Sequence, residues 1–198
     1  MDHETLKIIR AEHAALRAVL RTIPLLLEPQ RRTGGRPDFA MLRAMLFYVD
    51  EFAEQRHHRK ESMLLFPKLR ARTPRSRAQL DQLDGDHARG ERRIRNLQHA
   101  LLAFEMLGEP RRADFEQAAA RYIDFYLAHM ALEETEILPL AEKVLTEDDW
   151  DDLDRAFLGN RDALAGRTPE DGYRALFGRI SEALPPTAGF PLVSGTAP

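Results

Sequence analysis

The sequence predicts an all-α protein, an antiparallel four-helix bundle followed by short additional C-terminal helices. Apolar residues recur every three or four positions through four long stretches, which is the pattern of helices that pack through one face. Short breaks rich in Pro and Gly separate the stretches, and short connections make successive helices antiparallel. The second pair of stretches also repeats the histidine and glutamate pattern of the first pair, which indicates two related helical hairpins.

The composition is ordinary for a globular protein. Of the 198 residues, 43% are hydrophobic and 31% are charged, and the formal net charge is -3 with acidic and basic residues interspersed. A nucleic-acid surface would instead require a basic excess on one element. The chain has no cysteine, which excludes disulfides, iron–sulfur clusters and thiolate zinc sites. Nitrogen and oxygen therefore remain as the ligands for any metal.

The start of the chain lacks the basic and apolar regions of a signal peptide, and no apolar run approaches membrane-spanning length. These two features are the usual sequence marks of export and of membrane insertion. We therefore expect a cytoplasmic protein that binds neither nucleic acid nor membrane, and the pattern leaves its oligomeric state open.

The first hairpin is expected to consist of helices over residues 4–27 and 38–67. The break between them contains Pro29 and the turn former Gly34, and Pro67 would kink or end the second helix. The inward stripe of the first helix is Leu6, Ile9, His13, Leu16, Leu20, Ile23 and Leu27. The inward stripe of the second is Leu42, Leu46, Val49, Ala53, His57, Glu61 and Leu64.

The second hairpin is expected to consist of helices over residues 77–106 and 112–145. A turn begins at Thr73, and Gly108 ends the first of these helices. The inward stripe of the third helix is Leu80, Leu83, His87, Glu91, Ile94, Leu97 or Gln98, Leu101 and Phe104. The inward stripe of the fourth is Phe115, Ala119, Tyr122, Tyr126, His129, Glu133, Ile137, Leu140 and Val144.

Three segments organise the chain. Residues 1–145 are expected to form the bundle, and residues 146–184 a helical extension packed on it. Residues 185–198 are rich in Pro, Gly, Ala, Ser and Thr with few apolar anchors, so they are expected to form a mobile tail. Within the extension, Thr146 is expected to cap one short helix and Pro169 to begin another.

Each hairpin contains a matched histidine–glutamate pair. Glu61 follows His57 by four positions and Glu133 follows His129 by the same spacing, and each glutamate precedes an apolar run and a Pro. Residues four apart project from one face of a helix. Each pair can therefore contribute two ligands to one metal cluster.

Each hairpin also supplies a lone histidine after an acidic residue. Glu12 and His13 in the first hairpin match Asp86 and His87 in the second. Folded face to face, the hairpins place four histidines and two glutamates in the middle of the bundle. Neutral imidazole with carboxylate favours iron, manganese or zinc over calcium or magnesium. Two carboxylates buried among leucines are best explained by a pair of dications that the glutamates bridge.

Glu91 breaks the symmetry of the two hairpins. It follows His87 by four positions, where the first hairpin has Arg17. We expect Glu91 to be an additional ligand of one ion. The other ion would then have one protein ligand fewer and an open position for dioxygen, peroxide, nitric oxide or water. The alternative is that Glu91 is an exposed charge at the margin of its stripe.

Other polar residues near the motif are expected to lie outside the ligand set. His58 lies about 100° around the helix from His57, which indicates an outer or surface position. Glu134 is expected to be solvated. Tyr122 and Tyr126 are expected to pack in the core, with a hydrogen bond to a ligand or to a bound oxygen species as the alternative.

These motifs resemble those of the hemerythrin-like, or HHE cation-binding, family. The resemblance rests on residues 57–67 and 129–139 and covers residues 5–145 in motif order. It implies a four-helix bundle with a non-haem di-iron centre whose ligands are His13, His57, Glu61, His87, His129 and Glu133. Oxygen-carrying members have a histidine where this chain has Glu91, and they place the bridging carboxylate at the position of Glu134. These departures favour sensing, peroxide or nitric-oxide chemistry, or iron handling over reversible oxygen carriage.

Three functions follow as hypotheses. The first is a di-iron protein that binds or senses dioxygen, peroxide or nitric oxide, or that handles iron. The second is an oxidoreductase that acts on peroxide or nitric oxide or repairs iron centres. The third is a helical bundle with a zinc or structural metal site and an interaction role. The nitrogen and oxygen ligands would also accept manganese.

Overall fold

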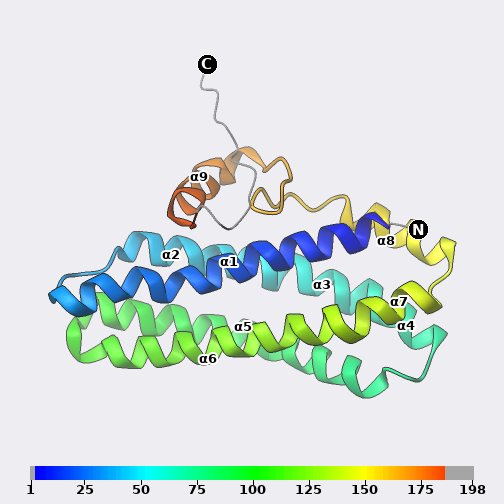
Figure 1. The fold of residues 1–198 in the computed structure, drawn as a ribbon, viewed down its shortest axis with the longest axis horizontal. Helices are drawn as coiled ribbons and strands as arrows, with labels where there is room; N and C mark the ends of the chain where they lie inside the picture. Colours follow the sequence, from blue (N-terminus) through cyan, green and yellow to red (C-terminus); the bar gives the residue numbers. More distant parts are fainter. Residues whose placement is uncertain (1–2, 186–198) are drawn as a thin grey trace.

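The computed structural model describes residues 3–185, which form four long antiparallel helical runs and a short helical extension (Figure 1). No strand occurs in that range, so the predicted all-α fold class is confirmed. The predicted tail lies outside the described residues, except for Pro185. No helix in residues 3–185 has both the length and the hydropathy needed to cross a membrane.

The first run is α1 (Glu4–Thr33) and the third is α5 (Arg77–Leu107). The second run is continuous and comprises α2 (Phe39–Tyr48), η1 (Val49–His57), α3 (His58–Lys60), η2 (Glu61–Leu65) and α4 (Phe66–Arg72). The fourth run comprises η3 (Glu109–Arg111), α6 (Arg112–Leu132), η4 (Glu133–Ile137) and α7 (Leu138–Val144). The extension contains α8 (Glu147–Phe157), η5 (Asp171–Tyr173) and α9 (Arg174–Ala183).

Gly34, rather than Pro29, ends the first helix. α1 passes through Pro24 and Pro29 and continues to Thr33, so it is longer than the sequence predicts. Gly34 has a φ of 71°, a left-handed conformation that glycine adopts without steric cost. Leu27 is the last buried apolar residue of α1. The carbonyl group freed by Pro29, that of the exposed Leu25, therefore lies near the exposed end of the bundle, where water can bind it.

Two wide helical turns occur at matched positions in the second and fourth runs. In η2 the N–H of Phe66 donates to the carbonyl of Glu61, and in η4 the N–H of Leu138 donates to the carbonyl of Glu133. Each bond spans five residues, as in a π-helix, instead of four. A proline follows each turn directly, and its ring nitrogen has no hydrogen for a regular helical bond.

These wide turns change which residues face inward. Leu64 and Leu140, which the α-helical period places inside, are only half-buried. Their neighbours Leu65 and Ala141 are buried instead. A uniform period is therefore wrong beyond each glutamate, because each π turn rotates the following segment by about one residue.

A layer of polar side chains divides the apolar core into two clusters. The larger cluster includes Leu16, Leu20, Leu42, Leu97, Phe115 and Tyr122. The smaller cluster includes Leu6, Ile9, Phe66, Leu83, Leu138, Trp150 and Phe157. Neither cluster contains the predicted metal-ligating residues. The polar layer therefore lies between two regions from which water is excluded.

The extension packs on the first and second runs (Figure 1). Asp154 of α8 accepts hydrogen bonds from the backbone N–H of Thr5 at 2.7 Å and from its hydroxyl at 2.6 Å. This carboxylate therefore caps the start of α1, where backbone N–H groups have no helical partner. At the other end of the extension, the ring of Phe177 in α9 lies 4.9 Å from that of Phe52.

Candidate metal centre

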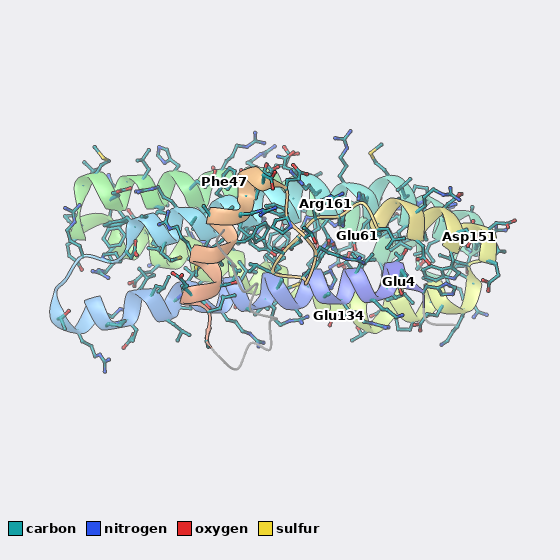
Figure 2. All side chains as sticks on the ribbon, turned by 90° about the horizontal axis from the view of Figure 1, so that it is seen from above. Glu4, Phe47, Glu61, Glu134, Asp151 and Arg161 are labelled. Atoms are coloured by element: carbon teal, nitrogen blue, oxygen red, sulfur yellow. The ribbon has the colours of Figure 1, made fainter. Side chains whose placement is uncertain are left out.

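Side chains from all four long runs meet in the polar layer, at the level of Glu61 and Glu134 in Figure 2. α1 supplies His13, the second run His57, His58 and Glu61, α5 His87, and the fourth run His129 and Glu133. All of these residues are buried except His87, whose side chain is 9% exposed. Six of the seven predicted ligand residues are thus brought together, and Glu91 is not.

One half of the layer joins the two histidines of the first hairpin to both glutamates. His13 Nε2 lies 3.1 Å from His57 Nε2. His57 Nε2 lies 3.2 Å from Glu61 Oε1, and His13 Nε2 lies 3.3 Å from Glu133 Oε2. Atoms bound to one metal at about 2.1 Å stand about 3.0–3.4 Å apart, so this half has the spacing of a ligand set.

The other half joins the two histidines of the second hairpin to the remaining glutamate oxygens. His87 Nε2 lies 3.0 Å from His129 Nε2. His129 Nε2 lies 3.4 Å from Glu133 Oε1, and His87 Nε2 lies 3.6 Å from Glu61 Oε2. Each glutamate therefore presents one oxygen to each half, as a carboxylate does when it bridges two ions.

Buried polar atoms without hydrogen-bond partners support metal binding in this layer. Both side-chain oxygens of Glu61 and of Glu133 are buried with no hydrogen-bond partner, and so is Nε2 of His58. Buried carboxylates without partners are costly, and native proteins rarely keep them. Cations held between the two glutamates would satisfy all five atoms, so the residues present fit a pair of metal ions.

The outer nitrogens of the first-hairpin histidines bind carboxylates. His57 Nδ1 lies 2.7 Å from Glu12 Oε2, and His13 Nδ1 lies 3.0 Å from Glu134 Oε1. Arg17 also donates to Glu134 at 2.9 Å. A carboxylate can only accept, so Nδ1 carries the proton and Nε2 presents its lone pair inward, as metal-binding histidines do. Glu134 is therefore a partner of His13 and is less solvated than the sequence predicts.

Ser62 sets the tautomer of His87. Its hydroxyl lies 2.8 Å from Asp84 Oδ1 and 2.8 Å from His87 Nδ1. The hydroxyl has one proton, and the carboxylate can only accept it. His87 Nδ1 must then donate to Ser62, which leaves its Nε2 free to bind a metal. In the same half, His129 Nδ1 lies 3.6 Å from Asp86 Oδ2.

His58 belongs to the layer, contrary to the expectation of an outer position. It is 2% exposed, and its ligand atom lies within 4.8 Å of those of Glu61, His87 and His129. The π-helical turns of η1 precede His58 and change the helical phase, so His57 and His58 both face inward. The matched position in the second hairpin is Met130, which is also buried. An apolar residue at the matched position was the sign in the sequence that this position faces inward.

Glu91 lies outside the layer, so the expectation of an additional ligand at this position is wrong in this structure. Its side chain is 53% exposed and pairs with Arg95 at 2.9 Å. The inward line of α5 runs through Asp86, Gly90 and Ile94, which are buried, and Glu91 is about 100° away from that line. The difference in ligand number between the two halves, expected from Glu91, comes instead from His58, which adds a third histidine to the half of His87 and His129.

A buried carboxylate, Glu54, supports His58 from outside the layer. It is 5% exposed and lies 3.2 Å from His58 Nδ1. Tyr122 donates its hydroxyl hydrogen bond to Glu54 at 2.9 Å, and Tyr126 donates to the same oxygen. The two tyrosines thus bind a carboxylate rather than a metal ligand directly. Glu54 is not predicted from the sequence, although it precedes His58 by the same spacing of four as the ligand pairs.

The carboxylates of the layer hold protons on His57 and His129. Burial, followed by the neighbouring carboxylate of Glu133, raises the pKa of Glu61. Burial acts most strongly on His57 and lowers its pKa, but the carboxylates around it, Glu61 first, outweigh burial and raise the pKa well above its usual value. The same balance, with Glu133 as the main attraction, raises the pKa of His129 to about 10. Without a cation, the layer therefore carries protons at neutral pH.

We expect cation uptake to release roughly one or two protons per chain near pH 7, because His57 and His129 must become neutral to bind a metal. The raised pKa values of these histidines also mean that affinity falls as pH is lowered. Titration calorimetry in two buffers of different ionisation enthalpy measures the proton count. Uptake of a cation with no proton release would contradict this assignment.

Gly90 allows Glu54 and Tyr126 to approach α5. A Cβ atom at this position would collide with both side chains, so we expect Gly90→Ala to destabilise the protein by about 1–3 kcal/mol. The gain in helix propensity, about 1 kcal/mol, opposes this effect. Gly85→Ala in the same helix is the control, because its Cβ would meet only the flexible end of Arg89. Urea denaturation should show a loss for Gly90→Ala alone; equal stability of the two variants would contradict the packing argument.

The comparisons with known proteins agree with this arrangement. A family model described as the hemerythrin HHE cation binding domain matches residues 4–141. This range contains every residue of the polar layer and ends before α8. The searches of curated proteins and of solved structures returned no match. The chain belongs to the hemerythrin HHE cation-binding domain family.

Proposed function

We propose that this protein is a non-haem di-iron protein that binds or senses a small molecule, namely dioxygen, peroxide or nitric oxide. The observation that carries the proposal is the pair of buried glutamates, each with one oxygen toward each half of the layer. Imidazole and carboxylate donors together suit iron. Two bound irons would supply a redox-active centre with affinity for these small molecules.

The two ions would have different surroundings. His13 and His57 would hold one ion, and His58, His87 and His129 the other, with both glutamates shared. The ion beside His13 and His57 would have fewer protein ligands and would keep a position for the small molecule. The two apolar clusters on either side of the layer exclude bulk water, which strengthens the electrostatic interactions inside it.

The outer partners orient the ligands before any metal arrives. Glu12, Glu134 and Ser62 accept the Nδ1 protons of the histidines that they face. Each such bond fixes the ring and raises the basicity of Nε2. The chain thus supplies imidazole rings whose Nε2 atoms already face the layer, and a metal displaces the protons that some of them carry.

The test is the metal content of the aerobically purified protein, with absorption in the near ultraviolet. We expect two irons per chain and ferric absorption. Replacement of either bridging residue, Glu61→Gln or Glu133→Gln, should lower the metal content to one ion or none, because each glutamate serves both halves. Glu136→Gln is the control, since Glu136 is an exposed residue of the same helical turn as Glu133.

Three outcomes would overturn the proposal or part of it. Unchanged metal content in both glutamate variants would contradict metal binding by the layer. Zinc in place of iron would overturn the redox role, because zinc has no redox chemistry, and would leave a structural site. Steady turnover of peroxide or nitric oxide with an electron donor would replace a sensor by an oxidoreductase.

A further inference from the structure

One polar side chain outside the family-matched region reaches the polar layer. Asn160 follows α8, is 7% exposed, and donates through Nδ2 to both oxygens of Glu12, at 2.7 Å and 3.0 Å. Glu12 in turn accepts the Nδ1 proton of His57 at 2.7 Å. A continuous set of hydrogen bonds thus runs from the extension to a predicted metal ligand.

Lys60 fixes the orientation of the Asn160 amide. Its ammonium group donates to Asn160 Oδ1 and, at 2.8 Å, to the carbonyl of Ala156. An ammonium can only donate, so the amide oxygen must face Lys60 and the amide nitrogen must face Glu12. The direction of the bond to Glu12 therefore follows from its neighbours.

The loop that carries Asn160 is held against the bundle and passes over the level of Glu61, near Arg161 in Figure 2. Two residues further on, the carboxyl of Asp162 accepts the hydroxyl proton of Tyr48 at 2.6 Å. Between this loop and the bundle lies a cavity of about 10 Å³, lined by Glu12, His13, Leu16, Tyr48, Phe52, Ala53, His57 and Asp162. That volume has room for about one water molecule, so the loop closes this side of the layer.

The internal repeat provides a comparison within the chain. Asp86, the counterpart of Glu12, pairs with Arg89, whose side chain is 55% exposed. Among residues 3–185, no hydrogen bond or ion pair joins Asp86 to the extension. The outer carboxylate of one half is therefore held by a buried neutral amide, and that of the other half by an exposed cation. The extension makes the two halves inequivalent.

We propose that Asn160 is a positioning residue for the metal ion beside His13 and His57, and that it acts through Glu12. This inference rests on the proposed function, because it concerns one of the two ions. A neutral donor orients Glu12 without cancelling its charge, so Glu12 remains a strong acceptor for His57. Outer partners of metal-binding histidines contribute about 10- to 100-fold in affinity, so affinity at this half depends on the hydrogen bonds from Asn160 to Glu12.

The experiment is a stepwise Co²⁺ titration of the full-length protein, with visible absorption and competition by a chelator to give two affinities. Asn160→Ala should weaken one affinity about tenfold, leave the other unchanged, and alter the spectrum of the affected ion. Asn160→Asp, which keeps the contact with Lys60 but cannot donate to Glu12, should give the same result. In a Glu12→Gln background, Asn160→Ala should have little further effect, because its action passes through Glu12.

Asp154→Asn is the control for the loss of a different contact between the extension and the bundle. Asp154 binds Thr5 at the start of α1 and makes no contact with Glu12, so both affinities should stay unchanged. Thermal unfolding of the metal-free variants verifies that each is folded.

The outcomes separate this inference from the function on which it rests. A wild-type protein that binds fewer than two Co²⁺ ions overturns the proposed function and, with it, the role of Asn160. Two ions in wild type with both affinities intact in Asn160→Ala and Asn160→Asp overturns the inference alone. Equal weakening at both ions, or an equal loss in Asp154→Asn, would also overturn it, because the effect would then be general destabilisation.

Discussion

The architecture depends on one electrostatic constraint, the burial of Glu61 and Glu133 side by side in the middle of the bundle. Two carboxylates in a region of low dielectric repel one another and lose their hydration, so the fold must bring compensating groups to them. Five histidines from four helical runs do so. The carboxylates, tyrosines and serine around the histidines then fix the rings, and apolar clusters close the layer at both ends.

Much of this arrangement could be predicted from the sequence, because it follows from a single helical spacing repeated in two hairpins. The helix order, the inward stripe of α1, and the pairs His57 with Glu61 and His129 with Glu133 all follow from that spacing. One position that could not be predicted, His58, lies where the period changes. A π turn is not visible in apolar periodicity, so His58 was placed outside the layer. The spacing of four from His87 predicts that Glu91 shares the face of His87. That face is not the centre of the inward side of α5, because the buried line runs through Asp86 and Gly90.

The two hairpins share a framework and differ at its edges. The matched histidine–glutamate pairs, the wide turns and the following prolines form the shared part, which is what two ions would need in common. The differences gather around the outer nitrogens of the histidines. On one side Glu54 and two tyrosines support His58, and on the other the extension approaches Glu12. The repeat thus provides the ligands, and these unmatched contacts distinguish the two halves.

The division of the core has a consequence for the cooperativity of folding. The smaller cluster joins the start of α1, the segments after both wide turns, and α8, whereas the larger one occupies the opposite end of the bundle. Apolar contact is interrupted between them, so cooperative coupling must pass through the polar layer. A cation pair bound by all four runs would join the two ends into one unit, while the metal-free layer would let them open with separate free energies.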